Sequence, residues 1–466
     1  MMKIYNTLTH KVEEFIPHKP ENVNLYTCGP TVYHYAHIGN LRSYIMEDVL
    51  EKTLSYVGYY VHRVMNITDV GHLSSDSDSG DDKMVKSAIK EKKSVLDIAD
   101  FYTKAFFEDL DKLNIKKPEV ISRATDNIDF YIKIIETLLK KGYAYESSGN
   151  IYFDITKLDD YYKLTNHKID EMVVGAREGV LNDVHKKNQG DFVLWFTKSK
   201  FQDQELKWES PFGVGYPGWH IECSGISIKY LGEYLDIHCG GVDNIFPHHT
   251  NEIAQSEAYL GHEWCKYWFH CEHLHMKDAK MSKSKGNVLT LNKLIEEGYN
   301  PLSYRYMCLN SHYRKILEYT DDALKTSENA YIKLLNKISL IIPEGEFQDG
   351  AYKDYNELFM NALEDDLNTA NALTVLYDLL KDDTVNGKTK ELLIRSFDKV
   401  LGLNLIGDTF NKTHPQHEEI MELIEKRNAF KKEHKFYEAD GIRNELADRG
   451  IELIDTREGT IYKYKD

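Results

Sequence analysis

Apolar residues recur along the chain with two different periods, and the period changes at loops that contain glycine or proline. Residues 23–28 (VNLYTC) form a short apolar run typical of a buried strand. After a Gly-Pro loop, Leu41, Ile45 and Val49 recur every four residues, which indicates an amphipathic helix. Residues 61–70 (VHRVMNITDV) return to an extended pattern. This order of strand, loop, helix and strand predicts a parallel α/β unit.

The same pattern returns later, in a strand over 234–241, a helix over 247–261 and a strand over 266–276. Between the two parts, residues 124–207 are interpreted as an insertion, with an amphipathic helix that ends at Gly142 and a β-hairpin around Ser-Gly-Asn. The acidic stretch Ser74–Asp82 (SSDSDSGDD) is predicted to be a loop. After Pro301 the pattern is helical, and the last fifty residues indicate two helices and a hairpin.

Composition narrows the class of protein. The chain has 466 residues, which predicts two to four domains. Its six cysteines are too sparse for a disulfide framework. No apolar run approaches the length of a bilayer span, and the first residues lack an apolar signal core. We therefore expect a cytoplasmic protein without a membrane partner. The net charge of −17 argues against non-specific nucleic-acid binding over the whole surface, so any nucleic-acid contact has to be local.

Four residues form a candidate metal site. His248 and Glu252 are four apart, so they share one face of a helix. Cys28 and Cys223 both stand in glycine-containing contexts (TCGP, ECSG). Zinc accepts thiolate, imidazole and carboxylate ligands together. The alternative is that the histidines cap a helix and the cysteines are small buried hydrophobes. The residues alone favour that alternative.

Two short motifs are candidates for phosphate binding. HIGN (His37 to Asn40) lies where a strand passes into a helix, and the N–H groups of a helix N-terminus attract phosphate. Gly39 allows a close approach of the backbone to a ligand. KMSKS (Lys280 to Ser284) offers cations and hydroxyls that suit a polyphosphate. The alternatives are a simple helix cap and a solvated surface loop.

Taken together in this order, HIGN and KMSKS resemble the signature of a class I aminoacyl-tRNA synthetase. Four longer stretches, CGPTVYHYAHIGNLR, PGWHIECSG, DIHCGGVDNIFPHHTNEIAQSEA and KMSKSKGN, resemble the cysteinyl-tRNA synthetase family. The resemblance extends over nearly the whole chain, and it reverses the preference for the alternative interpretations above. One departure is Cys239, which stands where the family has glycine.

The resemblance implies an α/β fold with a Rossmann-type catalytic domain, an insertion, an α-helical bundle and a small α+β C-terminal domain. In this chain, the two halves of the catalytic domain are expected at 1–123 and 208–300, with the connective insertion between them at 124–207. They are followed by a helical stem-contact region at 301–342, the helical bundle at 352–405 and an anticodon-binding domain at 417–466. It implies ATP-dependent attachment of L-cysteine to tRNA(Cys) through a cysteinyl-adenylate, with Mg²⁺ accompanying ATP. We expect a monomer.

The resemblance also implies roles for single residues. One zinc ion is held by Cys28, Cys223, His248 and Glu252, and the substrate thiolate binds that zinc. The amino-acid pocket is formed by Cys28, Trp219 and His238. ATP is bound by His37, Gly39, Asn40, Asp243 and Lys283, and catalysis depends on His37, Asn40, Lys280 and Lys283. A zinc–thiolate bond rejects serine, so no editing site is expected.

Two further features leave alternatives open. Arg427, Lys431, Lys432 and Lys435 share one helix face, which is either a tRNA contact or a solvated face. The strand residues Cys271, His273 and His275 alternate onto one face and form a weaker candidate for a second metal site.

Two other functions fit parts of the sequence: a ligase that transfers activated cysteine to an amino sugar, and a catalytically silent tRNA-binding relative. The C-terminal unit argues against the first, and intact HIGN and KMSKS argue against the second.

Overall fold

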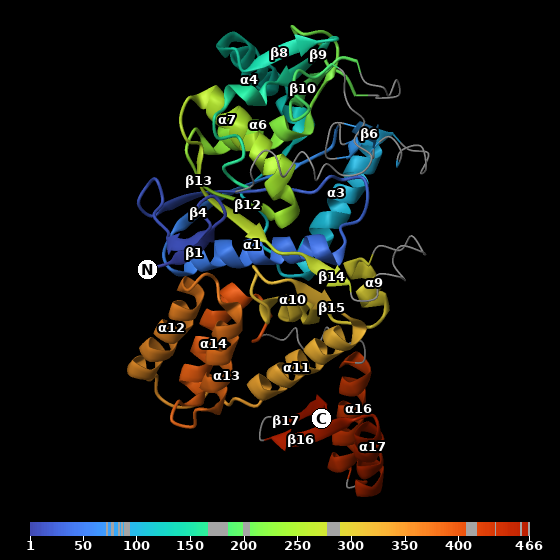
Figure 1. The fold of residues 1–466 in the computed structure, drawn as a ribbon. Helices are drawn as coiled ribbons and strands as arrows, with labels where there is room; N and C mark the ends of the chain where they lie inside the picture. The colour runs from blue at the N-terminus through green and yellow to red at the C-terminus, as the bar shows by residue number, and fades with distance from the viewer. Residues whose placement is uncertain are drawn as a thin grey trace. The chain divides into compact units, whose positions relative to one another are not determined.

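The computed structural model describes residues 1–70, 73–75, 79–82, 84, 87, 94–165, 185–198, 206–276, 289–406, 417–433, 435–456 and 459–464 (Figure 1). The chain divides into two compact units, each described by itself below. Unit 1 comprises Met1–His275, Tyr313–Leu317 and Glu364–Leu367. Unit 2 comprises Met276–His312, Glu318–Leu363 and Asn368–Asp466. None of the helices among the described residues is both long and apolar enough to cross a bilayer.

Unit 1 is built on a five-stranded sheet in which every neighbouring pair is parallel. The strands lie in the order β13 (Cys265–Cys271), β12 (Leu235–Gly241), β3 (Asn22–Thr27), β4 (Tyr60–Ile67) and β7 (Val120–Arg123). The two central strands, β3 and β12, come from opposite sides of the insertion. Nearly every side chain of β12 is buried, as expected for a parallel strand with helices on both faces.

Helices cover the sheet on both faces. They are α1 (Ile38–Tyr56), α3 (Val95–Lys112), α6 (Trp219–Leu231) and α7 (Thr250–Leu260), whereas α4 (Ile128–Lys141) packs on α6 and α7. The chain passes from β3 to β4 in one direction across the sheet and from β12 to β13 in the other. Right-handed connections therefore put α1 and α7 on opposite faces, and Figure 1 shows α1 across the sheet from α6 and α7. The reversal makes the carboxyl ends of β3 and β12 the topological switch point, where ligands of such folds bind.

An antiparallel sheet has the strand order β11 (Tyr216–Pro217), β10 (Phe192–Phe196), β9 (Asn150–Phe153) and β8 (Ala144–Ser147). Its strands β8 to β10 belong to the predicted insertion, and β11 lies beyond residue 207, where the insertion was predicted to end. The predicted hairpin is confirmed, because β8 and β9 pair with Ser147 opposite Asn150. The predicted helix C-cap is also confirmed, because Gly142 follows α4 with a left-handed φ of 79°. Apolar residues of α4, α6, β9 and β10 share one core with the end of β3.

Short elements complete unit 1. They are the strands β1 (Lys3–Asn6), β2 (Lys11–Glu14), β5 (Leu73–Ser75), β6 (Ser79–Asp82) and the turns η1 (Ala124–Asn127), η2 (Ile155–Lys157), η3 (Val242–Asn244) and η4 (Ile245–His249), of which η4 is π-helical. The loop prediction for Ser74–Asp82 needs a correction, because β5 and β6 form an antiparallel pair there. Local strand pairing outweighs the low strand propensity of an Asp- and Ser-rich sequence. A further pair, β14 (Leu274–Met276) with β15 (Leu317–Tyr319), falls at the boundary of the units.

Unit 2 is helical up to a final hairpin. Its helices are α9 (Leu291–Glu296), α10 (Pro301–Leu309), α11 (Asp321–Ser339), α12 (Asp349–Glu364), α13 (Thr369–Lys381), α14 (Gly387–Leu401), α16 (His417–Lys432) and α17 (Phe436–Asp448). The antiparallel strands β16 (Ile451–Thr456) and β17 (Gly459–Tyr464) pack with α16 and α17 around their own apolar core. The α/β fold class with a helical region and an α+β C-terminus is therefore confirmed.

Candidate metal centre

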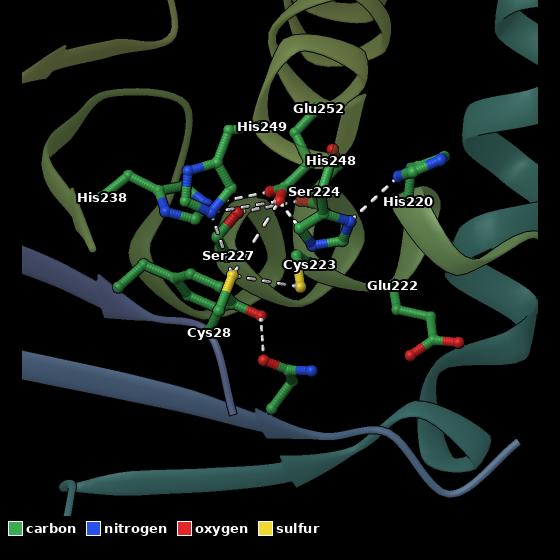
Figure 2. A network of polar contacts seen from close by, with 12 residues as sticks. Cys28, His220, Glu222, Cys223, Ser224, Ser227, His238, His248, His249 and Glu252 are labelled. Atoms are coloured by element: carbon green, nitrogen blue, oxygen red, sulfur yellow. Dashed lines mark hydrogen bonds and ion pairs between the residues drawn. The ribbon is translucent and has the colours of Figure 1, made fainter. Parts of the chain in front are cut away.

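Buried side chains that bind metals gather at the switch point. Cys28 directly follows β3, and its N–H donates to the Cys239 carbonyl of β12. Next to Cys28 lie His248 and His249 of η4 and Glu252 in the first turn of α7 (Figure 2). One ligand atom from each of these four residues lies within 4.8 Å of the others. This is the one such group in the part of the chain that the structure describes.

Cys223 on α6 joins this group through Cys28. Its Sγ lies 3.8 Å from the Cys28 Sγ. Two sulfurs that share a tetrahedral zinc, each at about 2.3 Å, lie about 3.8 Å apart. On the opposite side, Glu252 Oε1 lies 2.9 Å from His248 Nε2 and 4.0 Å from Cys28 Sγ. The structure thus brings all four predicted ligands together, with His249 as a fifth member. These five residues are called the metal cluster below.

Local packing explains why the helices present these side chains to one point. Gln255 of α7 donates to the His220 carbonyl at 2.6 Å and to Ser224 Oγ at 2.7 Å, which fixes α7 against α6. His248 and Glu252 lie one helical turn apart across the junction of η4 and α7. Gly240 leaves space for His249, because a Cβ there would lie 2.7 Å from the His249 Cε1 atom.

Outer polar groups hold the cluster members in place. His220 Nδ1 lies 2.9 Å from His248 Nδ1, and His238 Nε2 lies 2.9 Å from Glu252 Oε2. His249 Nδ1 lies 2.8 Å from the Nε2 atom of His270. Partners of this kind fix the ring orientation and tautomer of metal-binding groups. His238, predicted in the amino-acid pocket, is therefore fully buried beside Glu252.

The charge distribution of the cluster suits a cation. Burial by itself would raise the pKa of Glu252, but His238 and His248 outweigh it and lower that pKa, so the carboxyl is ionised. Burial also raises the pKa of the Cys28 thiol, and the hydrogen bond with Cys223 raises it further. The hydrogen bond from Cys28 and the nearby His248 overcome the effect of burial on Cys223 and lower its pKa. A carboxylate and a thiolate are thus present near neutral pH. Burial alone would lower the pKa of His248, but Glu252 and Cys223 raise it to about 10, so a metal that binds this ring has to replace a proton.

The donor set fits zinc better than a hard cation. Two sulfurs, two imidazoles and one carboxylate are the ligands of a borderline-soft metal, whereas Mg²⁺ and Ca²⁺ prefer oxygen alone. Burial and the neighbouring His238 and His270 lower the pKa of His249, so its ring stays neutral and can bind metal. Sequence reasoning missed His249 as a ligand candidate. The available signal was the His248–His249 doublet, which places a second imidazole next to a predicted ligand.

The Trp219 ring forms the edge of this centre. Trp219 is the first residue of α6, and its ring stacks on the His248 ring with 4.1 Å between centroids. The ring is partly exposed, whereas the His248 ring beneath it is buried. Trp219 therefore contacts the metal cluster directly, and its role in an amino-acid pocket stays a prediction.

The predicted ATP residues lie at the N-terminus of α1. His37 Nδ1 accepts from the Asn40 N–H at 3.1 Å, and Asn40 Oδ1 accepts from the His37 N–H at 3.3 Å. This capping box begins the helix, so the capping interpretation is confirmed, whereas the phosphate interpretation stays a prediction. A Cβ on Gly39 would lie 3.0 Å from the Cε1 and Nδ1 atoms of the His37 ring, so a side chain at this position would crowd that ring. Burial lowers the pKa of His37, and the charge of nearby Asp243, which follows β12, opposes that shift.

Several predicted sites lie elsewhere or outside the described residues. Lys280 and Lys283 fall in 277–288 and are not described. Among the described residues, the only metal-type cluster excludes Cys271, His273 and His275, so nothing supports a second metal site on that strand. The Cys271 Sγ contacts the carbonyl of its neighbour Glu272 instead.

The basic face of α16 divides into buried and exposed members. Arg427 is 1% exposed, and both its terminal nitrogens bind Asp455 at 2.9 Å. A guanidinium held this way cannot reach a phosphate, so the proposed tRNA contact of Arg427 is corrected to a structural ion pair. Lys431 also binds Asp455, at 2.7 Å, and Lys435 binds Glu433 at 2.7 Å. Both lysine side chains keep more than a third of their surface exposed.

Comparison with known proteins agrees with this architecture. Residues 14–329 match the family described as the tRNA synthetases class I (C) catalytic domain, and residues 358–405 match the DALR domain. Methionyl-tRNA synthetase of Mycobacterium tuberculosis in complex with methionyl-adenylate shares the fold, with a TM-score of 0.55 over 82% of this chain and 88% of the other, at 15% identity.

Curated relatives are similar over almost their full length. The chain is 44% identical to the cysteine–tRNA ligase of Treponema denticola, 43% to that of Brachyspira hyodysenteriae and 41% to that of Borreliella burgdorferi. Each match covers 99% of both chains. With the class I catalytic domain spanning most of the chain, these relatives show that it belongs to the cysteine–tRNA ligases, a family of class I aminoacyl-tRNA synthetases.

Proposed function

We propose that the chain attaches L-cysteine to tRNA(Cys) in two steps at the switch point of unit 1. In the first, a carboxylate oxygen of cysteine attacks the α-phosphorus of Mg²⁺-bound ATP, and pyrophosphate leaves. In the second, a ribose hydroxyl at the tRNA 3′-end attacks the activated carbonyl, loses its proton and releases AMP. Neither step needs a protein nucleophile, so catalysis rests on positioning and on stabilisation of charge.

In this proposal one zinc ion is held by Cys28, Cys223, His248 and Glu252, and His249 lies within reach of the same ion. When bound there, zinc supplies a borderline-soft Lewis acid that favours a thiolate over the hydroxyl of serine. The chain's own part is to keep the donors together in a buried place, with His238 orienting Glu252 and His220 orienting His248. Trp219 packs on His248 and closes the pocket against water.

The ATP contacts follow from the N-terminus of α1. His37, Gly39 and Asn40 are proposed to receive the phosphates, because the positive end of the helix dipole lies there and favours an anion. Asp243, next to His37, is proposed to bind the ribose hydroxyls. Lys280 and Lys283 are proposed to stabilise the leaving pyrophosphate.

Contact with tRNA is assigned to residues 301–342 and to the C-terminal unit 417–466. There, Lys431, Lys432 and Lys435 offer exposed ammonium groups to phosphates, and Phe436 and Tyr437 expose 59% and 90% of their surface for stacking with unpaired bases. We further propose that the protein acts as a cytoplasmic monomer.

One observation supports the proposal most strongly: the metal cluster and the capping box of α1 belong to the same edge of one sheet, so they can hold the two ends of one small substrate. The test is cysteine-dependent exchange of pyrophosphate into ATP, followed by charging of tRNA with cysteine. Serine and an amino-sugar acceptor serve as controls. Absence of exchange with folded, zinc-loaded protein would refute the proposal, and transfer to the amino sugar in place of tRNA would support the rival ligase.

A further inference from the structure

A buried amide connects the segment that carries Cys28 to the neighbouring strand. Asn66 lies on β4 and is 2% exposed. Its Oδ1 accepts from the Gly29 N–H at 2.7 Å and from the Tyr26 hydroxyl at 3.1 Å. Its Nδ2 donates to Thr68 Oγ1 at 3.1 Å. One side chain therefore makes three hydrogen bonds, and two of them go to residues that flank Cys28.

The backbone of Gly29 is packed tightly against the backbone of Asn66. A Cβ on Gly29 would lie 1.6 Å from the Asn66 carbonyl oxygen, so the two main chains are in direct contact. Tyr26 is fully buried and pairs with Val64 of β4 through the sheet. Tyr26, two residues before Cys28, and Gly29, directly after it, are thus both held against β4. These contacts on both sides of Cys28 limit where the Cys28 Sγ can lie.

The other end of the network reaches Cys223. Thr68 Oγ1 donates to Glu222 Oε2 at 2.8 Å, and Glu222 precedes Cys223 on α6. Asn66 therefore lies at the centre of a buried network that touches both cysteine-bearing segments.

We propose that Asn66 is a positioning residue for the metal cluster: its Oδ1 holds the Cys28 segment, and its Nδ2 ties that segment through Thr68 and Glu222 to the helix that carries Cys223. Asn66 itself binds neither metal nor substrate in this proposal. The inference rests on the proposed zinc site. Outer groups of this kind alter metal affinity by about 10- to 100-fold when they are removed.

A matched control separates positioning from general stability. Asn127 is also 2% exposed and also makes three side-chain hydrogen bonds: it donates to Ser122 Oγ and the Arg123 carbonyl, and it accepts from Lys229 Nζ. Loss of this amide leaves buried polar groups unpaired just as loss of Asn66 does. It does so at η1, without a hydrogen bond to the residues that flank Cys28.

The experiment measures zinc affinity of the full chain by competition with a chromophoric chelator, in four proteins: wild type, Asn66→Ala, Asn66→Asp and Asn127→Ala. Asn66→Ala is expected to bind zinc about 10- to 100-fold more weakly. Asn66→Asp keeps an Oδ1 acceptor for Gly29 and Tyr26 but loses the Nδ2 donor to Thr68, so its zinc affinity is expected to fall between those of Asn66→Ala and wild type. Asn127→Ala is expected to bind zinc like wild type although it unfolds at lower temperature.

A second measurement reports on the pocket. In pyrophosphate exchange, Asn66→Ala is expected to raise KM for cysteine while KM for ATP is unchanged. Equal zinc affinity in Asn66→Ala and wild type would overturn the inference, as would equal weakening in Asn66→Ala and Asn127→Ala. Weakening in Asn66→Asp as large as in Asn66→Ala would overturn the role of the Oδ1 acceptor. If wild type itself binds no zinc, the proposed zinc site fails, which is a different result from failure of the positioning role.

Discussion

The Sγ atoms of Cys28 and Cys223 lie 3.8 Å apart although 195 residues separate them in the chain. One follows the first strand of the central pair, and the other lies on a helix that is made only after the insertion. Both sulfurs are buried, and each cysteine is free of a disulfide. Their meeting beside Glu252 assembles the donor set that a borderline-soft metal prefers.

Cys223→Ser is expected to lower zinc content and cysteine activation together, because a hydroxyl is a poor ligand for zinc at neutral pH. Zinc per chain after dialysis and cysteine-dependent pyrophosphate exchange check this. Cys308→Ser is a suitable control, since Cys308 is a buried free cysteine on α10 in unit 2. A full complement of zinc in Cys223→Ser would show that Cys223 is no ligand.

His37 has two separable tasks. Its ring caps α1, and it is proposed to contact ATP phosphate. His37→Ser keeps a good N-cap but removes the imidazole, whereas His37→Ala removes both, and loss of a cap costs about 1 kcal/mol. We expect both variants to lose exchange activity, and only His37→Ala to lose helix stability in thermal unfolding. Normal exchange rates in His37→Ser would mean that the ring serves the helix alone.

Removal of residues 417–466 is expected to leave cysteine-dependent pyrophosphate exchange intact and to weaken charging of tRNA. The reason is that α16, α17, β16 and β17 have an apolar core of their own, apart from the sheet that carries the metal cluster. Rates of both reactions measured on the same preparation check this. An equal fall in the two rates would contradict the assigned roles.

Arg427 and Lys432 are expected to behave differently despite their shared helix face. Arg427→Ala should destabilise the C-terminal unit, since it leaves Asp455 without its bidentate partner. Lys432→Ala should leave the stability of this unit unchanged. It should reduce the slope of the logarithm of tRNA affinity against the logarithm of salt concentration by about one. Thermal unfolding and salt-dependent binding of tRNA distinguish these outcomes. A salt effect in Arg427→Ala with unchanged stability would restore the phosphate role.

Acid is expected to weaken the C-terminal unit through Asp455. Hydrogen bonds from Arg427 and Lys431 lower the pKa of Asp455 well below its usual range. A group with a depressed folded pKa contributes stability above its unfolded pKa of about 3.9, and that contribution is lost as the pH falls further. The side chain is 42% exposed, so solvent screening reduces the size of the effect.

The check compares wild type with Asp455→Asn by amide hydrogen exchange in β16 and β17 at about pH 6 and about pH 3, on either side of the carboxyl pKa range. The stability difference between the two proteins should shrink at the lower pH. A constant difference would show that the Asp455 charge does not stabilise this hairpin.

The sequence predicts the elements of the sheet well because period and loop composition are local signals. Strand 23–28 and the helix with Leu41, Ile45 and Val49 correspond to β3 and α1. The pairing of β3 with β12 has no local signal. It became predictable only through the family resemblance, since no period or spacing links two strands across an insertion.

The position of a side chain was predictable from the sequence where a motif defines it. It was not predictable where it depends on contacts between residues that are far apart in the chain. The spacing of His248 and Glu252 indicates a shared helix face. By contrast, the position of His249 beside Cys28 depends on the irregular turn η4, in which Phe246 has a non-helical backbone and which no propensity scale indicates. Arg427 has the spacing of an exposed base, yet its partner Asp455 lies on β16, and only the folded hairpin brings the two together.

The central pair of strands has a consequence for synthesis of the chain. The Asn24 N–H of β3 donates to Asp236 of β12, which is 212 residues further along. At usual elongation rates of about 5–20 residues per second, β3 is made roughly 10–40 s before β12. During that interval the edge of β3 that later pairs with β12 has no neighbouring strand. Cys28 also leaves the ribosome before any other member of the metal cluster has been made. The nascent first half must therefore be kept from pairing with other strands until the chain beyond the insertion has been made.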